Sequence, residues 1–333
     1  MTPTSHIRVT YHIHPYAMQL PGGGEIQLLK YVSHLKETKC DVTLHDIWNP
    51  RLADAHILHH FHLIPGSIPF LDFVKKLNVK IAISPNLWIN ETNSSHIHLK
   101  EIQHYYRLAD SIICNSHAEI SNLAATTGLP TEKACVVYNG VDSDFSVPVS
   151  ETLFRDWTNI KGPYLLNVAN IEPRKNQLSA IKAARKIGVP LVSIGHIRDQ
   201  AYFDRCAEEG QNGFFLYMGA LNQMDPRLRS AYQHCAAFLF PSFLETPGIA
   251  ALEAAAAGCQ LVVTREGSAY EYFGDHAFYV NPWSEDSITD AVNRALSQKK
   301  NTILSEKIMR TFSWPAIAKQ LTDAYSRLQS KSI

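Results

Sequence analysis

Two glutamates, Glu245 and Glu253, stand in the segment of this chain whose residue types suggest the most chemistry. Glu245 lies in a loop broken by proline and glycine after the apolar run 236–240, and Glu253 lies in an alanine-rich run after Gly248. This pattern predicts a strand, a loop and a helix that begins near Gly248, where free N–H groups attract anions. Glycine lets a phosphate approach the backbone, whereas carboxylates accept hydrogen bonds from neutral hydroxyls. Phosphate together with a polyol suggests a sugar nucleotide.

The alternative for this pair is two solvated glutamates, one in a surface loop and one on a helix face. Glu253, however, lies in a helix otherwise made of alanine, leucine and isoleucine, which predicts that the whole helix is buried. A buried charge needs a partner or a ligand. We therefore favour a functional role.

Two adjacent cations, Arg174 and Lys175, follow the predicted strand 164–169 in the turn that starts at Asn170. Ligands of open α/β sheets bind at the carboxyl ends of the strands. Cations there could neutralise a diphosphate leaving group. A solvated basic turn that caps a helix is the alternative, and the nearby helix start at Gly248 favours the functional interpretation.

A glycine-rich loop that contains Gly23 and Gly24 follows the first predicted strand and opens a helix. Such loops allow a phosphate or a sugar to approach the backbone. The spacing is not GxGxxG, and no acidic residue follows a second strand at the distance that would hold a ribose. These two absences disfavour a nicotinamide dehydrogenase.

Four histidines, His56, His59, His60 and His62, cluster around the third predicted strand. Alternation places His56, His60 and His62 on one face, which could indicate a metal site. No acidic residue or cysteine accompanies them in the sequence. We therefore expect them to line a crevice, with His60 on the acceptor side.

Length and composition predict two domains without a charge bias. The chain has 333 residues, with 31 Lys+Arg against 31 Asp+Glu. A chain of this length exceeds one typical domain, and its charge balance argues against nucleic acid as a partner. Six scattered cysteines predict buried thiols in a reducing compartment. The polar start and the absence of a long apolar run predict a cytoplasmic protein with no signal peptide.

Short apolar runs alternate with helical patterns, which predicts an α/β fold with parallel sheets. We expect an N-terminal domain over 1–155, a C-terminal domain over 160–311, and a last helix over 314–330 that returns to the first domain. The predicted strands are 7–11, 41–45, 56–59, 79–84, 111–114 and 135–138 in the first domain, and 164–169, 190–194, 213–218, 236–240, 260–263 and 277–280 in the second.

These pieces, in this order, resemble the GT-B-fold retaining glycosyltransferases of the "glycosyltransferases group 1" family, which is family 4 of the sequence classification. The resemblance covers nearly the whole chain and is strongest over 240–258, with further matches at 267–271 and 312–314. It implies two doubly wound, Rossmann-like domains that face a central cleft.

The resemblance also implies a role for each candidate residue. Glu253 would hold the ribose hydroxyls and Glu245 the transferred sugar, while Arg174 and Lys175 would stabilise the leaving group. The remaining residues that it implies are Gly248, Ile249, Gly23, Gly24 and Asn170 on the donor side, and Asn86 on the acceptor side.

Three positions depart from the family pattern. Asn170 stands where the family often has an arginine, Asn86 where many members have a histidine, and Pro247 where phenylalanine is usual. The Glu-Pro-Arg-Lys-Asn form of the cation turn is frequent among mannosyltransferase-like members, which favours GDP-mannose.

The expected function is therefore a retaining, metal-independent transfer of a sugar to a hydroxyl of a glycan or a lipid-linked acceptor. The donor, a GDP- or UDP-sugar, is a substrate, and we expect no cofactor. Membrane contact would be peripheral at most, at the inner face of the membrane. Two alternatives stay open: a non-catalytic GT-B binding or scaffold subunit, and a sugar-nucleotide epimerase.

Overall fold

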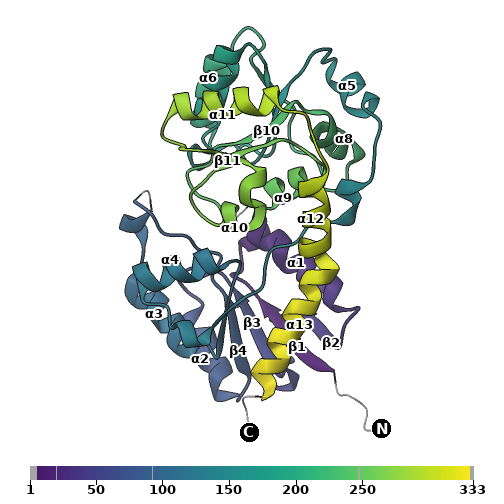
Figure 1. The fold of residues 1–333 in the computed structure, drawn as a ribbon. Coiled ribbons are helices and arrows are strands. Elements are labelled where there is room, and N and C mark those ends of the chain that lie inside the picture. The colour runs from purple at the N-terminus through teal and green to yellow at the C-terminus, as the bar shows by residue number, and fades with distance from the viewer. Residues whose placement is uncertain (1–5, 20, 92, 247, 331–333) are drawn as a thin grey trace. The chain divides into compact units, whose positions relative to one another are not determined.

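The computed structural model describes residues 6–19, 21–91, 93–246 and 248–330, and it divides into two compact units (Figure 1). The first unit joins the chain up to Gly140 to the segment from Phe312 onward. The second unit is the continuous segment Val141–Thr311. Each unit has its own sheet, so each is described by itself.

The sheet of the first unit has six parallel strands in the order β2-β1-β3-β4-β5-β6. Because the chain passes from β1 outward to β2 and then returns to β3 on the other side, the topological switch point lies between β1 and β3. The strands are β1 Ile7–His12, β2 Cys40–Leu44, β3 Ile57–Phe61, β4 Lys80–Ser84, β5 Ser111–Cys114 and β6 Ala134–Val136.

Helices on both faces bury the central strands of this sheet, and every residue of β3 is buried. This agrees with the continuous apolar runs that parallel strands require. The helices are α1 Gly23–Leu35, α2 Ile68–Lys76, α3 Leu99–Leu108, α4 His117–Thr127 and α13 Trp314–Ser330.

The last helix, α13, completes the first unit. The Tyr325 hydroxyl lies 2.6 Å from the Tyr11 hydroxyl and 2.6 Å from Nδ1 of His59. All three side chains are fully buried. A buried hydroxyl without a partner is costly, so these hydrogen bonds fix how the helix lies on β1 and β3.

The second unit also has six parallel strands but a different order, β12-β11-β10-β7-β8-β9, with three strands on each side of its switch point. Its chain runs outward through β8 and β9 and then returns to β10, so the switch point lies between β7 and β10. The strands are β7 Leu165–Val168, β8 Leu191–Ile194, β9 Phe215–Tyr217, β10 Ala237–Phe240, β11 Leu261–Thr264 and β12 Phe278–Val280; the helices are α5 Thr152–Thr158, α6 Gln177–Ile187, α7 Gln200–Glu209, α8 Pro226–His234, α9 Ile249–Ala256, α10 Ala269–Phe273, α11 Glu285–Ser297 and α12 Ile303–Phe312.

The segment after Gly140 belongs to the second unit, whereas the sequence pattern placed the end of the first domain at 155. Contacts with helix α8 explain why this segment belongs to the second unit. The Gln233 amide of α8 donates 2.8 Å to the Val147 carbonyl and accepts 3.0 Å from the Val149 N–H. Helix α5 packs on α8 and buries Phe154.

All six cysteines are free thiols, and five of them are buried. Within the described residues, we find no helix with the length and apolar content that crossing a membrane requires.

Candidate functional site

The loops that leave β7 and β10 meet beside the switch point of the second unit. Asn176, at the end of the first loop, donates from Nδ2 to the Pro241 carbonyl at 3.1 Å and to the Pro282 carbonyl at 2.8 Å. The Phe243 N–H donates 3.0 Å to the Arg174 carbonyl. These bonds hold together loops that begin at three different strands.

Glu245 lies between the two predicted cations. Lys175 Nζ forms an ion pair with Glu245 Oε1, and Nη1 of Arg174 lies 3.5 Å from the same oxygen. Arg174 also donates 3.1 Å to the Leu244 carbonyl and 2.8 Å to Glu172. The structure therefore brings together the three residues that the sequence assigned to catalysis.

Lys175 is a half-buried cation that lies beside an aromatic ring. Its side chain is 12% exposed, and Nζ lies 5.0 Å from the centre of the Phe240 ring. Burial lowers the pKa of Lys175, and the Glu245 carboxylate opposes that shift. A half-buried charge acts more strongly on a ligand than a fully solvated one, because less water screens it.

Gly248 occupies a backbone conformation that favours glycine, with φ +86°, just before α9 begins at Ile249. A Cβ atom at this position would lie 2.9 Å from Glu245 Oε2 and 2.9 Å from the Phe240 ring. The glycine thus lets the Glu245 carboxylate lie against the start of α9. Pro247, one of the three departures from the family pattern, lies outside the described residues.

Glu253 is buried in α9 and already accepts hydrogen bonds. The Tyr232 hydroxyl donates 2.8 Å to Oε2, and the Gln223 amide donates 2.6 Å to Oε1. The expectation that a buried Glu253 needs partners is confirmed, and two of them are now known. A carboxylate has about four acceptor positions, so hydroxyls of a ligand could share these oxygens.

Arg198 is a cation of this site that the sequence interpretation missed. It follows β8, and with the Asn170 amide oxygen turned toward it, its Nε and Nη2 donate to that oxygen at 3.0 and 3.2 Å. Its Nη1 lies 3.6 Å from Glu172. Asn170 stands where the family often has an arginine, and here Arg198, which follows the neighbouring strand β8, places a positive charge beside it.

In the first unit, Gly24 lies against side chains of the loops that follow β3 and β4. A Cβ atom on Gly24 would lie 2.1 Å from Nε2 of His62 and 3.1 Å from Nδ2 of Asn86. No protein atom lies within 4 Å of the corresponding Cβ position on Gly23 among the described residues. The predicted residues Gly24 and Asn86 are therefore neighbours, and His62 joins them.

Asn86 belongs to a chain of amides at the carboxyl ends of the strands. The Asn115 amide donates 2.7 Å to Oδ1 of Asn86, and the Gln27 amide donates 2.6 Å to Asn115. The buried Glu119 carboxyl accepts from the Leu87 and Asn115 N–H groups at 3.0 and 2.6 Å. Burial raises the pKa of Glu119 from 4.5 to about 7.

The placement of His60 corrects the expectation that it lines a crevice. His60 is 1% exposed, its ring stacks on Tyr105 of α3, and its Nδ1 lies 2.9 Å from Nδ1 of His12. Because helices cover both faces of a parallel sheet, alternation along β3 does not separate buried side chains from exposed ones. His62, after the strand, is the histidine that lies beside Asn86.

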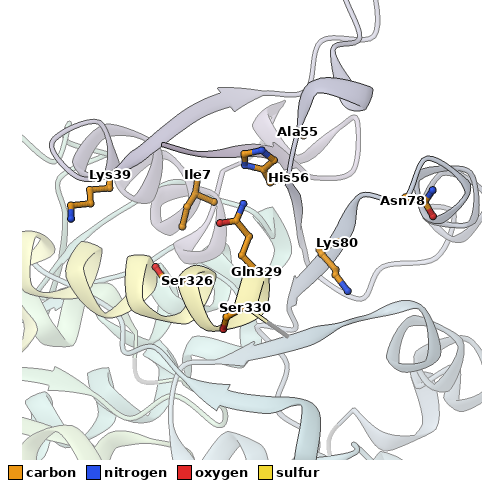
Figure 2. A pocket seen from close by; sticks show the side chains of 9 residues that line it. All are labelled: Ile7, Lys39, Ala55, His56, Asn78, Lys80, Ser326, Gln329 and Ser330. Atoms are coloured by element: carbon orange, nitrogen blue, oxygen red, sulfur yellow. The ribbon is translucent and has the colours of Figure 1, made fainter. Parts of the chain in front are cut away.

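A pocket of about 630 Å³ lies at the opposite, amino end of the first sheet (Figure 2). Its lining includes Ile7 at the start of β1, Lys80 at the start of β4, and His56 just before β3. Ligands of α/β sheets bind at the carboxyl ends of strands, so this pocket is separate from the candidate site.

Two family models match this chain. The one described as "Glycosyl transferases group 1" matches residues 150–310, and the one described as "Glycosyltransferase Family 4" matches residues 42–145. Together they cover the candidate residues of each unit except those before residue 42, which include the glycine loop.

Among curated proteins, similar chains include an uncharacterized glycosyltransferase of Methanocaldococcus jannaschii, 26% identical over 70% of this chain and 64% of the relative. The serotype-specific mannosyltransferase WbdA of Escherichia coli is 24% identical over 74% of this chain and 32% of the relative. O-antigen chain mannosyltransferase B of Escherichia coli is 25% identical over 50% of this chain and 46% of the relative. The chain thus matches less than two thirds of the length of each of these relatives.

Solved structures share the fold over almost the whole chain. Sucrose-phosphate synthase from Thermosynechococcus elongatus superposes with a TM-score of 0.80 at 15% identity, over 98% of this chain and all 100% of that one. Anabaena HepE in complex with UDP-glucose superposes with a TM-score of 0.77 at 16% identity, over 97% and 100%. At these identities the likeness shows the fold alone, a GT-B arrangement of two parallel α/β sheets.

Proposed function

Because the chain belongs to the group 1 glycosyltransferases, we propose that it transfers a sugar from a nucleotide diphospho-sugar to a hydroxyl of a glycan or glycolipid. The observation that carries this proposal is the cluster of Lys175, Arg174 and Glu245 beside the start of α9. Two cations and a helix N-terminus together suit a diphosphate.

The second unit would bind the donor. Lys175 and Arg174 pair with Glu245 in the free protein, and an incoming diphosphate would give them a second anionic partner. Glu245 would then be able to accept hydrogen bonds from the hydroxyls of the transferred sugar. Glu253, held by Tyr232 and Gln223, would accept from the ribose hydroxyls.

The reaction would break the bond between the anomeric carbon and the diphosphate and form a bond to the acceptor oxygen on the same face of the sugar, and the proton of the acceptor hydroxyl would pass to the departing diphosphate. Charge accumulates on the departing diphosphate in the transition state, so fixed cations lower the barrier. Arg198, beside Asn170, would add to this positive field. In this proposal the cationic side chains stabilise the leaving group without a metal ion.

The weak preference for mannose rests on two supports. The cation turn has the Glu-Pro-Arg-Lys-Asn form over 172–176, and two of the relatives are named mannosyltransferases. Other relatives and neighbours are named sucrose-phosphate synthase or are complexes with UDP-glucose. GDP-mannose is therefore the donor to test first, with UDP-glucose as its competitor.

The test measures donor binding and transfer with purified protein. A donor at about 100 times its Kd should stabilise the folded protein by about 2.7 kcal/mol, seen as a rise in Tm. Lys175→Ala should lower turnover by about 10²- to 10³-fold, and Glu253→Ala should weaken donor binding. Lys182→Ala is the matched control, because Lys182 is a half-exposed lysine of the same unit that pairs with Glu285.

Three outcomes would count against the proposal. No sugar nucleotide raises Tm, or both site variants bind donor as the wild type does, or sugar is epimerised without transfer. Retention is checked separately by the anomeric configuration of the product in NMR spectra.

A further inference from the structure

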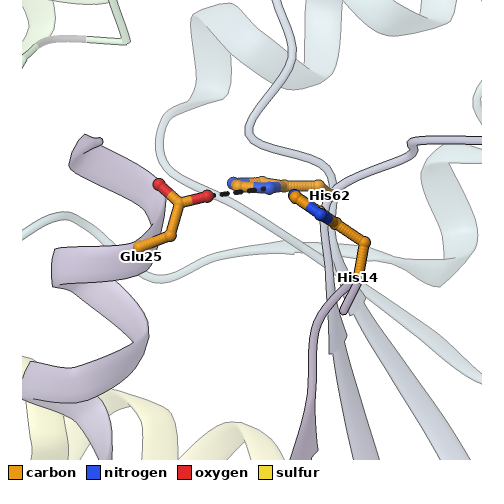
Figure 3. A group of neighbouring side chains, drawn as sticks. All are labelled: His14, Glu25 and His62. Atoms are coloured by element: carbon orange, nitrogen blue, oxygen red, sulfur yellow. Dashed lines mark ion pairs between the residues drawn. The ribbon is translucent and has the colours of Figure 1, made fainter. Parts of the chain in front are cut away.

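Three side chains that can bind metal ions meet at the switch point of the first unit (Figure 3). His14 follows β1, His62 follows β3, and Glu25 lies in the first turn of α1. One ligand atom from each residue lies within 4.8 Å of the others. Figure 3 shows the carboxylate and the two rings pointing toward one another.

Ring nitrogens in this cluster lack hydrogen-bond partners. Nδ1 of His14 and Nδ1 of His62 are both buried, and neither has a partner among the described residues. The separation between His62 Nδ1 and Glu25 Oε1 is 3.6 Å, too long for a hydrogen bond. Buried polar atoms without partners are rare, and an ion is one explanation for them.

The side chains in the cluster are of the kinds that bind divalent cations. Neutral imidazole and carboxylate are the ligands that Zn²⁺ accepts in mixed sites.

The surrounding backbone holds two of the three side chains in place. Glu25 Oε2 accepts 2.7 Å from the Gly22 N–H, which leaves Oε1 facing His62. A second hydrogen bond of this kind orients carboxylates that bind metals. His62 itself has φ +70°, a left-handed conformation that non-glycine residues rarely adopt and that concentrates at functional sites.

We propose that His14, Glu25 and His62 bind one divalent transition-metal ion of the Zn²⁺ type. Metal bonds of about 2.1 Å would bring the ligand atoms to about 3.4 Å from one another, close to the 3.6 Å that already separates His62 Nδ1 from Glu25 Oε1. Three protein ligands leave a fourth position for water or for a hydroxyl of a bound polyol. The site lies in the first unit and is separate from the leaving-group chemistry proposed for the second.

The test is Zn²⁺ binding by the full chain after treatment with a chelator. Equilibrium dialysis followed by elemental analysis should find one Zn²⁺ per chain at micromolar free metal, and Zn²⁺ should raise Tm. His62→Asn keeps a residue type that tolerates the left-handed conformation, and Glu25→Gln keeps an acceptor for Gly22. Each should weaken binding at least about 10-fold.

His98→Asn is the control, because His98 is an exposed histidine outside the cluster. The Tm of each variant without metal shows that it has folded. The proposal fails if no Zn²⁺ is retained, or if both cluster variants bind as the wild type does, since the ion would then use others of the 16 histidines. Because these readouts need no donor, their failure is distinguishable from failure of the transfer proposal.

Discussion

The two units carry their candidate residues at the same place in the topology but with different chemistry. In the second unit, the loops beside β7 and β10 bring together Arg174, Lys175 and Glu245. In the first unit, the loops beside β1 and β3 bring together imidazoles, with an amide at Asn86. The same position in the topology can thus carry cations that suit an anionic ligand, or imidazoles and a carboxylate that suit a metal ion, depending on which side chains lie near the strand ends.

The largest effect that we expect concerns Glu119, whose carboxyl holds the Asn86 loop of the first unit. Its pKa rises from 4.5 to about 7 on folding, so the folded state holds a proton that the unfolded state releases between these values. The contribution of Glu119 to stability is greatest below pH 4.5 and falls by about 3 kcal/mol as pH rises to about 7. The buried histidines of the same unit act in the opposite direction, because burial lowers the pKa of His12 and of His59.

Glu119→Gln should remove most of that fall. Hydrogen exchange of the first unit, followed by mass spectrometry at pH 5 and pH 8, measures it, with exchange of the second unit in the same sample as the control. Equal pH dependence in the variant and the wild type would show that Glu119 is not the group responsible.

The next effect compares the glycines at the two helix starts. Gly248→Ala adds a Cβ atom against Glu245 in a left-handed conformation, so we expect a loss of about 1–3 kcal/mol in the second unit. Gly23→Ala meets open space at the start of α1 and should be neutral or stabilise the first unit by up to about 1 kcal/mol.

Chemical denaturation of both variants separates the two glycines. If Gly248→Ala is as well tolerated as Gly23→Ala, the Gly248 loop is less constrained than its φ and its contacts indicate.

The smallest effect comes from a matched pair of hydroxyl deletions. Tyr325→Phe removes the partner of Tyr11 and His59 and should cost the first unit about 1–2 kcal/mol. Tyr232→Phe removes a partner of Glu253 and should act on the second unit by a similar amount. Hydrogen-exchange rates of peptides from β3 and β10 report the stability of the first and the second unit separately. If either variant destabilises both units equally, its effect is not confined to the unit that contains the deleted hydroxyl.

Much of the fold follows from local pattern, and the reason is burial. All twelve predicted strands are present within a residue or two of their expected ends, because parallel strands that are buried on both faces appear as continuous apolar runs. Helix α5 was missed, since its seven residues carry no sustained period. Helix α7 was missed as well, between strands that were both expected.

The site was predictable where its residues are neighbours in sequence and not where folding brings distant loops together. The pair Arg174 and Lys175 could be found from one turn. Arg198 could not be found in this way, because it follows β8 whereas its partner Asn170 follows β7. His14, Glu25 and His62 also lie apart in the sequence, since β2 and β3 separate Glu25 from His62. A histidine just after a predicted strand is a signal for His14 and His62, and Glu25 directly follows the glycine-rich loop.

The hydrogen bonds of Tyr325 have a consequence for the order in which the chain acquires its structure during synthesis. The second unit is one continuous segment, so all of its strands leave the ribosome before α13 does. The first unit is translated earlier, yet Tyr11 and His59 stay without their buried partner until Tyr325 emerges. Since domains fold as units once their contacts are available, the half of the protein that is made first is the half that is completed last.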